Sequence, residues 1–269
     1  MKKYLAVIVL SLIILPFQSC FSQRKDVGDP GNTRMMNGEN DLLIEGKKFD
    51  EVMTLLEVPK ATEENSNINR YLVKGAVVFR NCEFQKSFLA SIKRDGESYY
   101  TTFGQQVFFD SCYFWGDVDF RGAIIQGVLN FRNCVFYGNA NFEEIECTSN
   151  AWFANCFFKR EVRFQNAFFN RKANFFNATF DSICSFQSAF FNQDAQFSNS
   201  KFWKYTDFTL CTFNMGAFFN YSTFFERSLF NNSGLRGRAE FVNAVFKKGV
   251  EMKTCRFSGD LKFNKAEFH

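Results

Sequence analysis

This 269-residue chain contains very little histidine and proline, and its positive and negative charges nearly cancel. It contains one histidine, His269, and three prolines. A single histidine leaves no Ser/His or Cys/His arrangement for nucleophilic catalysis and no histidine and cysteine set for zinc. With 32 basic and 28 acidic residues, the formal net charge is only +4. The sequence therefore lacks the electrostatic signature of a nucleic-acid-binding protein, and we predict no catalytic site, cofactor, metal or nucleic-acid partner.

The sequence also lacks an apolar run long enough to cross a bilayer comfortably. The run from about Leu5 to Phe17 follows a start with two lysines, which is the pattern of a signal peptide. We therefore predict export, with a signal peptide over residues 1–22. Two processing routes stay open: lipidation at Cys20, with the signal ending before it, and ordinary cleavage before Gln23. The expected location is the periplasm, the outer membrane or the cell surface, with a lipid anchor in the first case.

The composition changes twice after the leader. Residues 23–45 are mostly polar, contain glycine and proline and show no periodicity, which predicts a flexible tether. Within residues 46–65, Phe49, Val52 and Leu56 fall on one face of a helix that a proline then ends. We expect this segment to form a short helical N-terminal cap over the repeats that follow.

An 11-residue period dominates the chain downstream of about residue 66. Large apolar residues, phenylalanine in most cases, alternate at steps of six and five residues from Phe103 to Phe268. A small or β-branched residue stands two positions before most of them. Because residues two apart in an extended segment point to the same side, both should face inward. The core should therefore be a ladder of stacked phenylalanine rings.

Strings such as FFNATF, FQNAFF and AEFVNAVF resemble the phenylalanine-rich variant of the pentapeptide-repeat family. That resemblance implies an all-β fold, a right-handed quadrilateral β-helix with four short faces in each coil, over residues 66–269. The extra residue at every second turn predicts coils of roughly 22 residues. We expect the longer turns, such as WGDV and YGNA, to place their added residue at positive φ. One column at the coil spacing should form an asparagine ladder at a turn, where Asn tolerates left-handed backbone. Its members are Asn133, Asn155, Asn177, Asn199 and Asn243.

The register of the repeats breaks between Phe88 and Phe103. Within this stretch, Asp95-Gly96 lies between two arms of alternating apolar and polar residues, which is a hairpin signal. We expect residues 88–103 to form an excursion, either a projecting β-hairpin or one irregular coil.

Eight of the nine cysteines lie within the repeats and take inward positions. The chain has no CxxC motif. Side chains stacked in parallel seldom reach the dihedral angle of a disulfide, so we predict buried, free thiols that act as small core residues. These cysteines are Cys82, Cys112, Cys134, Cys147, Cys156, Cys184, Cys211 and Cys255.

Outward-facing residues, sorted by column at the coil spacing, predict one aromatic face and one polar face. The polar face carries Asp119, Arg121, Asn141, Glu143 and Arg163. An aromatic stripe is typical of a contact site for a protein, a glycan or a membrane interface, but β-strands also favour aromatic neighbours that only stack on one another. Both interpretations stay open. The candidate contact face comprises Tyr113, Trp115, Val135, Tyr137, Phe157, Trp203 and Phe225.

The last residues of the sequence, AEFH, are in full repeat. An open coil exposes an unpaired strand edge, so we expect homodimerisation through the C-terminal coil, which the family resemblance also implies for some members.

The predicted function is a non-enzymatic, envelope-associated scaffold or protein-binding solenoid with a protein or glycan partner. A carbohydrate-active β-helix enzyme is one alternative, for which Glu143, Glu144, Glu146 and Glu161 are the outward carboxylates. The tight turns argue against it. The resemblance also implies a second alternative, a DNA-mimicking topoisomerase inhibitor. The near-neutral charge and the leader argue against that function.

Overall fold

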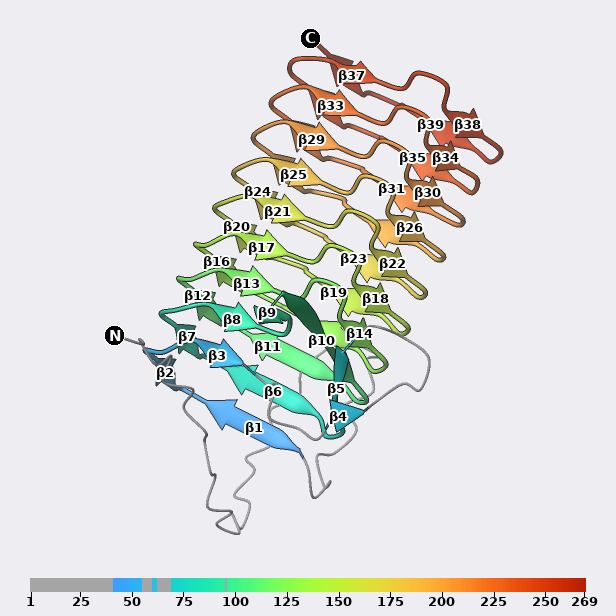
Figure 1. The fold of residues 1–269 in the computed structure, drawn as a ribbon. Helices are drawn as coiled ribbons and strands as arrows, with labels where there is room; N and C mark the ends of the chain where they lie inside the picture. The colour runs from blue at the N-terminus through green and yellow to red at the C-terminus, as the bar shows by residue number, and fades with distance from the viewer. Residues whose placement is uncertain (1–40, 55–59, 62–68, 95) are drawn as a thin grey trace, which may run out of the picture.

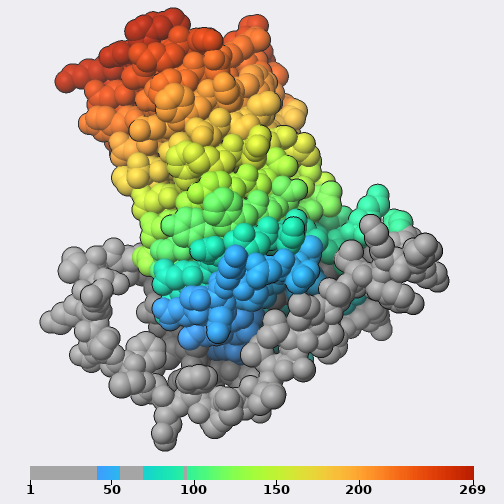
Figure 2. All heavy atoms as spheres, turned by 90° about the vertical axis from the view of Figure 1, so that its left-hand side faces the viewer, coloured from blue at the N-terminus to red at the C-terminus, as the bar shows by residue number. Residues whose placement is uncertain are grey.

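The computed structural model describes residues 41–54, 60–61, 69–94 and 96–269, and all of its strands belong to one four-faced solenoid (Figure 1). Successive coils stack as bands along a rod (Figure 2). Among the described residues, no helix is long and apolar enough to cross a membrane. The all-β quadrilateral β-helix predicted from the repeats is confirmed.

Each face of the rod is a sheet, and consecutive strands of a coil belong to faces A, B, C and D in turn. Face A contains β1 (Leu42–Glu45), β6 (Val77–Arg80), β11 (Val107–Asp110), β15 (Leu129–Asn130), β19 (Ala151–Trp152), β23 (Ala173–Asn174), β27 (Ala195–Gln196), β31 (Ala217–Phe218), β35 (Ala239–Glu240) and β39 (Leu261–Lys262). Face B contains β2 (Lys48–Phe49), β7 (Glu83–Phe84), β12 (Tyr113–Phe114), β16 (Val135–Phe136), β20 (Phe157–Phe158), β24 (Thr179–Phe180), β28 (Lys201–Phe202), β32 (Thr223–Phe224), β36 (Val245–Phe246) and β40 (Glu267–Phe268).

Faces C and D complete the coil. Face C contains β3 (Met53–Thr54), β8 (Phe88–Leu89), β13 (Val118–Asp119), β17 (Ala140–Asn141), β21 (Val162–Arg163), β25 (Cys184–Ser185), β29 (Thr206–Asp207), β33 (Ser228–Leu229) and β37 (Val250–Glu251). Face D contains β4 (Lys60–Ala61), β5 (Asn69–Val73), β10 (Glu97–Phe103), β14 (Ile124–Ile125), β18 (Glu146–Cys147), β22 (Phe168–Phe169), β26 (Phe190–Phe191), β30 (Thr212–Phe213), β34 (Gly234–Leu235) and β38 (Arg256–Phe257), and β9 (Ile92–Arg94) pairs with β10.

The register between neighbouring coils is parallel, and from β10 onward it has an offset of 22 residues. On face B, for example, Phe136 pairs with Phe158, and the N–H of Val135 donates to the carbonyl of Cys112 at 2.9 Å. Because each coil bonds to the coil before it and the coil after it, the short strands still satisfy their backbone polar groups. The predicted coil length is confirmed.

Stacked phenylalanine rings fill the interior of the rod. The buried ring of Phe175 stacks between Phe153 at 5.0 Å and Phe197 at 4.8 Å, with interplanar angles of 3° and 1°. It also meets Phe164 and Phe186 edge to face, at 5.3 and 5.2 Å. Each ring thus has stacked contacts along the rod and T-shaped contacts across it, the two geometries that the ring quadrupole favours.

Left-handed backbone occurs at regular intervals in the five-residue turns. The predicted asparagine ladder is present: Asn155 has φ 57°, its side-chain amide donates to Asn133 at 3.1 Å, and Asn177 donates to Asn155 at 2.9 Å. Tyr221, at φ 59°, interrupts this column. The expectation of positive φ in the longer turns is wrong for Gly116 and for Gly138. Glycine is needed there because a Cβ on Gly138 would collide with the backbone of Gly116, one coil away.

The excursion between faces C and D contains a β-hairpin, which is one of the two alternatives left open by the sequence. β9 and β10 pair antiparallel, with Arg94 opposite Glu97, and Gly96 has φ 85°. Phe79 pairs with Phe109, which is 30 residues further along the chain, so this coil is eight residues longer than the coils that follow it. The hydroxyl of Thr101 donates to the carbonyl of Ala90 at 2.6 Å and ties the base of the hairpin to the rod.

The N-terminal boundaries differ from the prediction. Residues 41–54 form a further coil, because β1, β2 and β3 pair in parallel with β6, β7 and β8. The ring of Phe49 stacks on Phe84 at 5.0 Å, and Leu42 and Met53 pack against the core. The helical cap is therefore wrong for residues 46–54, and so is the tether for residues 42–45. An open edge of β6 to β8 selects extended backbone for a segment whose apolar spacing also fits a helix. The signal peptide, Cys20 and residues 23–40 lie outside the described residues.

Truncation of a core ring should destabilise the rod much more than truncation of its outward neighbour. We expect Phe175→Ala to lower the free energy of unfolding by about 3–5 kcal/mol, because the stacked neighbours cannot collapse into the gap. Phe176→Ala is the matched control, since the Phe176 side chain is 40% exposed and should change stability by less than about 1 kcal/mol. Urea unfolding followed by circular dichroism measures both. Equal effects of the two substitutions would contradict the ring-ladder description of the core.

Candidate binding surfaces

The structure places all seven residues of the predicted contact face on the outer side of face B. Their backbone positions lie in β12, β16 and β20 or directly after β12, β16, β28 and β32. The side chains of Tyr113, Trp115 and Trp203 are 43%, 46% and 41% exposed. Val135, Tyr137, Phe157 and Phe225 are half-buried. Among the four faces, face B therefore has the most large apolar side chains exposed to solvent.

The predicted stripe is divided into two parts. Between them lie Lys159 and Asp181, which form an ion pair at 3.5 Å, and the ammonium of Lys159 stands over the ring of Phe157 at 4.0 Å. We call Tyr113, Trp115, Val135, Tyr137 and Phe157 the N-terminal patch. The C-terminal patch consists of Trp203, Tyr205, Tyr221 and Phe225.

Rings of neighbouring coils cover each other within each patch. Trp115 stacks on Tyr137 at 4.0 Å and 3°, and Trp203 stacks on Phe225 at 3.9 Å and 2°. Such cross-strand pairs stabilise a sheet by themselves. They also cover one face of each ring, so that this face is closed to an external ligand. The surface is rigid, because each ring is held by its neighbour.

Two members of the C-terminal patch were missed from the sequence. Tyr205 and Tyr221 are 37% and 60% exposed. Both lie in turns, so a search restricted to residues next to the strand centres does not find them. The available signal was the interruption of the asparagine column at Tyr221.

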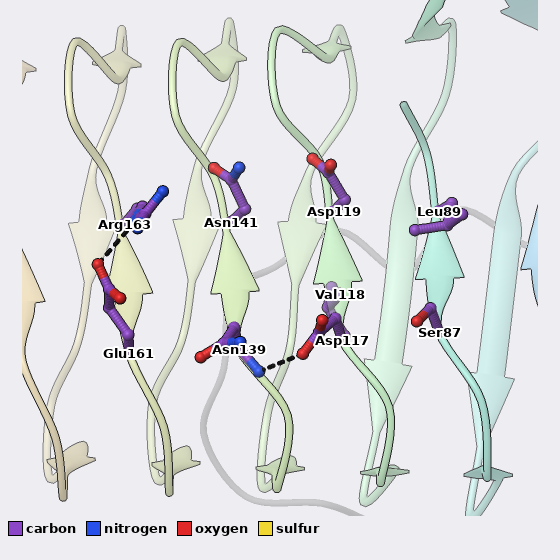
Figure 3. A pocket seen from close by; sticks show the side chains of 9 residues that line it. All are labelled: Ser87, Leu89, Asp117, Val118, Asp119, Asn139, Asn141, Glu161 and Arg163. Atoms are coloured by element: carbon purple, nitrogen blue, oxygen red, sulfur yellow. Dashed lines mark hydrogen bonds and ion pairs between the residues drawn. The ribbon is translucent and has the colours of Figure 1, made fainter. Parts of the chain in front are cut away.

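The polar face contains a shallow groove of about 270 Å³ on face C. Figure 3 shows two rows of side chains along it, Asp117, Asn139 and Glu161 in one row and Asp119, Asn141 and Arg163 in the other. Val118 belongs to the lining, and Ser87 and Leu89 close the N-terminal end. The groove thus crosses four successive coils, from β8 to β21.

The charged groups of this groove have partners within the protein. Asp117 accepts the backbone N–H of Asn139 at 2.7 Å, and Glu161 accepts the Nε–H of Arg163 at 2.7 Å. Burial raises the pKa of Asp119, although the N–H and the guanidinium of Arg121, at 2.9 and 3.2 Å, act in the opposite direction.

The outward carboxylates considered from the sequence do not form one cluster at the groove. Of the four, Glu161 lines it. Glu143 and Glu144 follow β17, and Glu146 belongs to β18 on the next face. Within the described part of the chain, no group of three or more His, Cys, Asp or Glu side chains is placed to hold a metal ion.

The eight cysteines of the repeats are free thiols, as predicted, and seven of them are buried. Several have a bonding role that the sequence did not reveal. The thiol of Cys156 donates to the carbonyl of Phe131 at 2.6 Å, and Cys211 donates to Phe186 at 2.9 Å. Ser233 makes the same bond to Phe208 at 2.6 Å. Burial raises the pKa of the Cys156 and Cys211 thiols.

The last coil, which the sequence analysis expected to mediate a homodimer, leaves Phe257, Leu261 and Phe268 exposed. The dimer contact itself stays a prediction.

Comparison with known proteins identifies the repeat. The family described as pentapeptide repeats (9 copies) matches residues 131–179, which run from the end of β15 to the start of β24 across the middle of the rod. No curated protein matches the chain, and no solved structure does.

The burial of the thiols predicts their reactivity. In a Cys20→Ser background, an aromatic disulfide reagent at pH 8 should react quickly with Cys255, the partly exposed thiol. The seven buried thiols should react only after unfolding, because burial keeps them protonated and out of contact with the reagent. Cys255→Ala should remove the fast phase, and all thiols should react in guanidinium. Fast reaction of a second thiol in the native protein would contradict this packing.

Proposed function

The chain is a pentapeptide-repeat protein, and we propose that it is a non-enzymatic scaffold at the cell envelope that binds a partner protein through the N-terminal patch of face B. The observation that carries the proposal is the exposure of Tyr113 and Trp115 on a rigid sheet. Exposed tryptophan and tyrosine rings next to half-buried apolar side chains are typical of the centre of a protein interface.

The geometry of the patch favours a protein partner over a glycan. Tyr137 covers one face of the Trp115 ring, so the pair offers edges and an uneven apolar surface, onto which a protein side chain packs. Val135 and Phe157, half-buried on adjacent strands, extend this surface. Because the strands and the stacked rings are already ordered, little conformational entropy would be lost on binding.

The envelope location is supported by the leader of the chain. Two lysines followed by the apolar run up to Phe17 are typical of a signal peptide. A lipid on Cys20 would hold the protein to a membrane, and cleavage before Gln23 would release it. Either route takes the rod out of the cytoplasm, and the polar residues 23–40 would separate it from the membrane in the first case.

Affinity capture tests this proposal. Protein beginning at Gln23 is immobilised and exposed to detergent-solubilised envelope, next to the variant Trp115→Ser/Tyr137→Ser/Phe157→Ser. We expect one partner protein to be captured, and the variant to lose at least about tenfold in affinity, because truncation of central interface aromatics typically costs more than 1 kcal/mol each.

The control variant is Trp152→Ser, which removes a half-buried tryptophan from face A. It should leave capture unchanged. Circular dichroism and the unfolding midpoint establish that each variant is folded. Equal capture by the triple variant and the unchanged protein would overturn the assignment to the N-terminal patch, and recovery of nothing but the protein itself would overturn the binding function.

A further inference from the structure

The C-terminal patch, like the N-terminal patch, contains three aromatic side chains with polar tips, here Trp203, Tyr205 and Tyr221. Trp203 directly follows β28, and Phe225 directly follows β32. The ring of Phe225 stacks on the ring of Trp203, and Tyr205 and Tyr221 lie in the flanking turns. The register places Phe202 opposite Phe224, so these residues occupy two adjacent coils of one face. They form a broad surface across the width of face B.

Tyr221 is present at a conformational cost. It adopts φ 59° in a column where Asn199, one coil earlier, and Asn243, one coil later, have φ 60° and 54°. Bulky side chains are rare in this region of backbone space, whereas asparagine tolerates it. Folding alone would favour asparagine at this position. Leu210 also adopts positive φ (61°) in the second column of five-residue turns, so it is the replacement of asparagine within its own column, and not the strain alone, that distinguishes Tyr221.

The two halves of face B also differ in charge. Residues 199–205, 221–227 and 243–249 carry five basic residues and one acidic residue, a net charge of +4. The corresponding earlier segments, 111–117, 133–139, 155–161 and 177–183, carry two basic and three acidic residues, a net charge of −1. Only the C-terminal half therefore attracts anions.

Three of the lysines in the C-terminal half have no ion-pair partner among the residues that the structure describes. They are Lys201, Lys204 and Lys247. Lys248, in contrast, pairs with Glu226 at 2.8 Å. The unpaired ammonium groups lie on the same coils as Trp203 and Phe225 and the coil that follows, so they surround the aromatic surface.

We infer that the C-terminal patch docks the rod onto a lipid surface with anionic headgroups. Tryptophan and tyrosine are the side chains that prefer the boundary between water and hydrocarbon. Each lysine near an anionic leaflet strengthens binding roughly fivefold. A protein partner fits less well, because lysine is depleted from protein interfaces and four of the five basic residues here are lysines.

This inference rests on the proposed function only for its setting at the envelope. It requires neither the partner protein nor the N-terminal patch. A test with purified protein and vesicles therefore fails independently of the capture experiment.

Tryptophan fluorescence provides a direct readout. In protein beginning at Gln23, Trp115→Phe/Trp152→Phe leaves Trp203 as the single tryptophan, and Trp152→Phe/Trp203→Phe leaves Trp115. With vesicles of phosphatidylcholine and phosphatidylglycerol in equal parts, emission from Trp203 should shift to shorter wavelength, and emission from Trp115 should not. Vesicles of phosphatidylcholine alone should shift neither, and added salt should reduce the shift, because it screens exposed charges.

Two variants separate binding from folding. Lys201→Glu/Lys204→Glu should weaken co-sedimentation with the anionic vesicles at least about 25-fold, since two favourable charges are lost and two unfavourable ones are added. Tyr221→Asn should weaken it as well, while the unfolding midpoint stays the same or rises, because asparagine tolerates the left-handed backbone at this position better than tyrosine. Trp115→Ser/Tyr137→Ser is the matched control and should bind vesicles like the unchanged protein.

Absence of binding to the anionic vesicles would overturn the inference. So would an emission shift at Trp115 and not at Trp203, or vesicle binding that Tyr221→Asn leaves unchanged. Capture of an acidic protein through Lys201 and Lys204, without vesicle binding, would assign the patch to a protein interface instead.

Discussion

The stacking of phenylalanine rings at the spacing of the coils is the interaction on which the whole rod depends. Neighbouring strands of a sheet lie about 4.8 Å apart, and the stacked rings of Phe175 and Phe197 have centroids at 4.8 Å. Rings and backbone can therefore repeat together with no mismatch along the rod. For the rings to stack, each coil must place its phenylalanine residues at the same positions along the coil. This requirement explains why the spacing of five and six residues is kept from coil to coil. The left-handed residue in each five-residue turn follows from the same requirement, because the chain must turn a corner within a few residues.

An interior that repeats so strictly leaves the outer columns free to vary. On face B, the position after each strand centre is Trp115, then Tyr137, Lys159 and Asp181, while the inward ring stays phenylalanine throughout. Successive coils therefore differ mainly in their outward-facing side chains, and the surface chemistry changes along the length of the rod. The two aromatic patches share one sheet and one kind of stacked pair, yet their surroundings have opposite charge. A single face can thus serve two contacts of different chemistry.

Much of this architecture could be predicted from the sequence because periodicity determines it. The phenylalanine ladder, the asparagine column and the hairpin around Gly96 all depend on local spacing and turn chemistry. Predictions failed where contacts with a neighbouring coil determine the local backbone conformation or the residue type. The spacing of Phe49 and Val52 fits a helix, but the edge of β7 and β8 selects strands. Gly138 looks like a positive-φ residue, but the backbone of Gly116 is what excludes a side chain. The groove on face C and the exposure of Tyr205 likewise depend on how turns of successive coils lie beside one another, which one repeat does not reveal.

The constant register between coils makes the rod a molecular ruler. Along face B, Phe114 pairs with Phe136, Phe136 with Phe158, Phe158 with Phe180 and Phe180 with Phe202, which places four coil steps between Trp115 and Trp203. At the strand spacing, this separation is about 19 Å. Duplication or loss of one 22-residue unit would change the distance by one strand spacing and leave both patches intact. The distance between the two patches can therefore change only in steps of one strand spacing. Duplication of a 22-residue repeat within the gene would lengthen this distance without altering the residues of either patch.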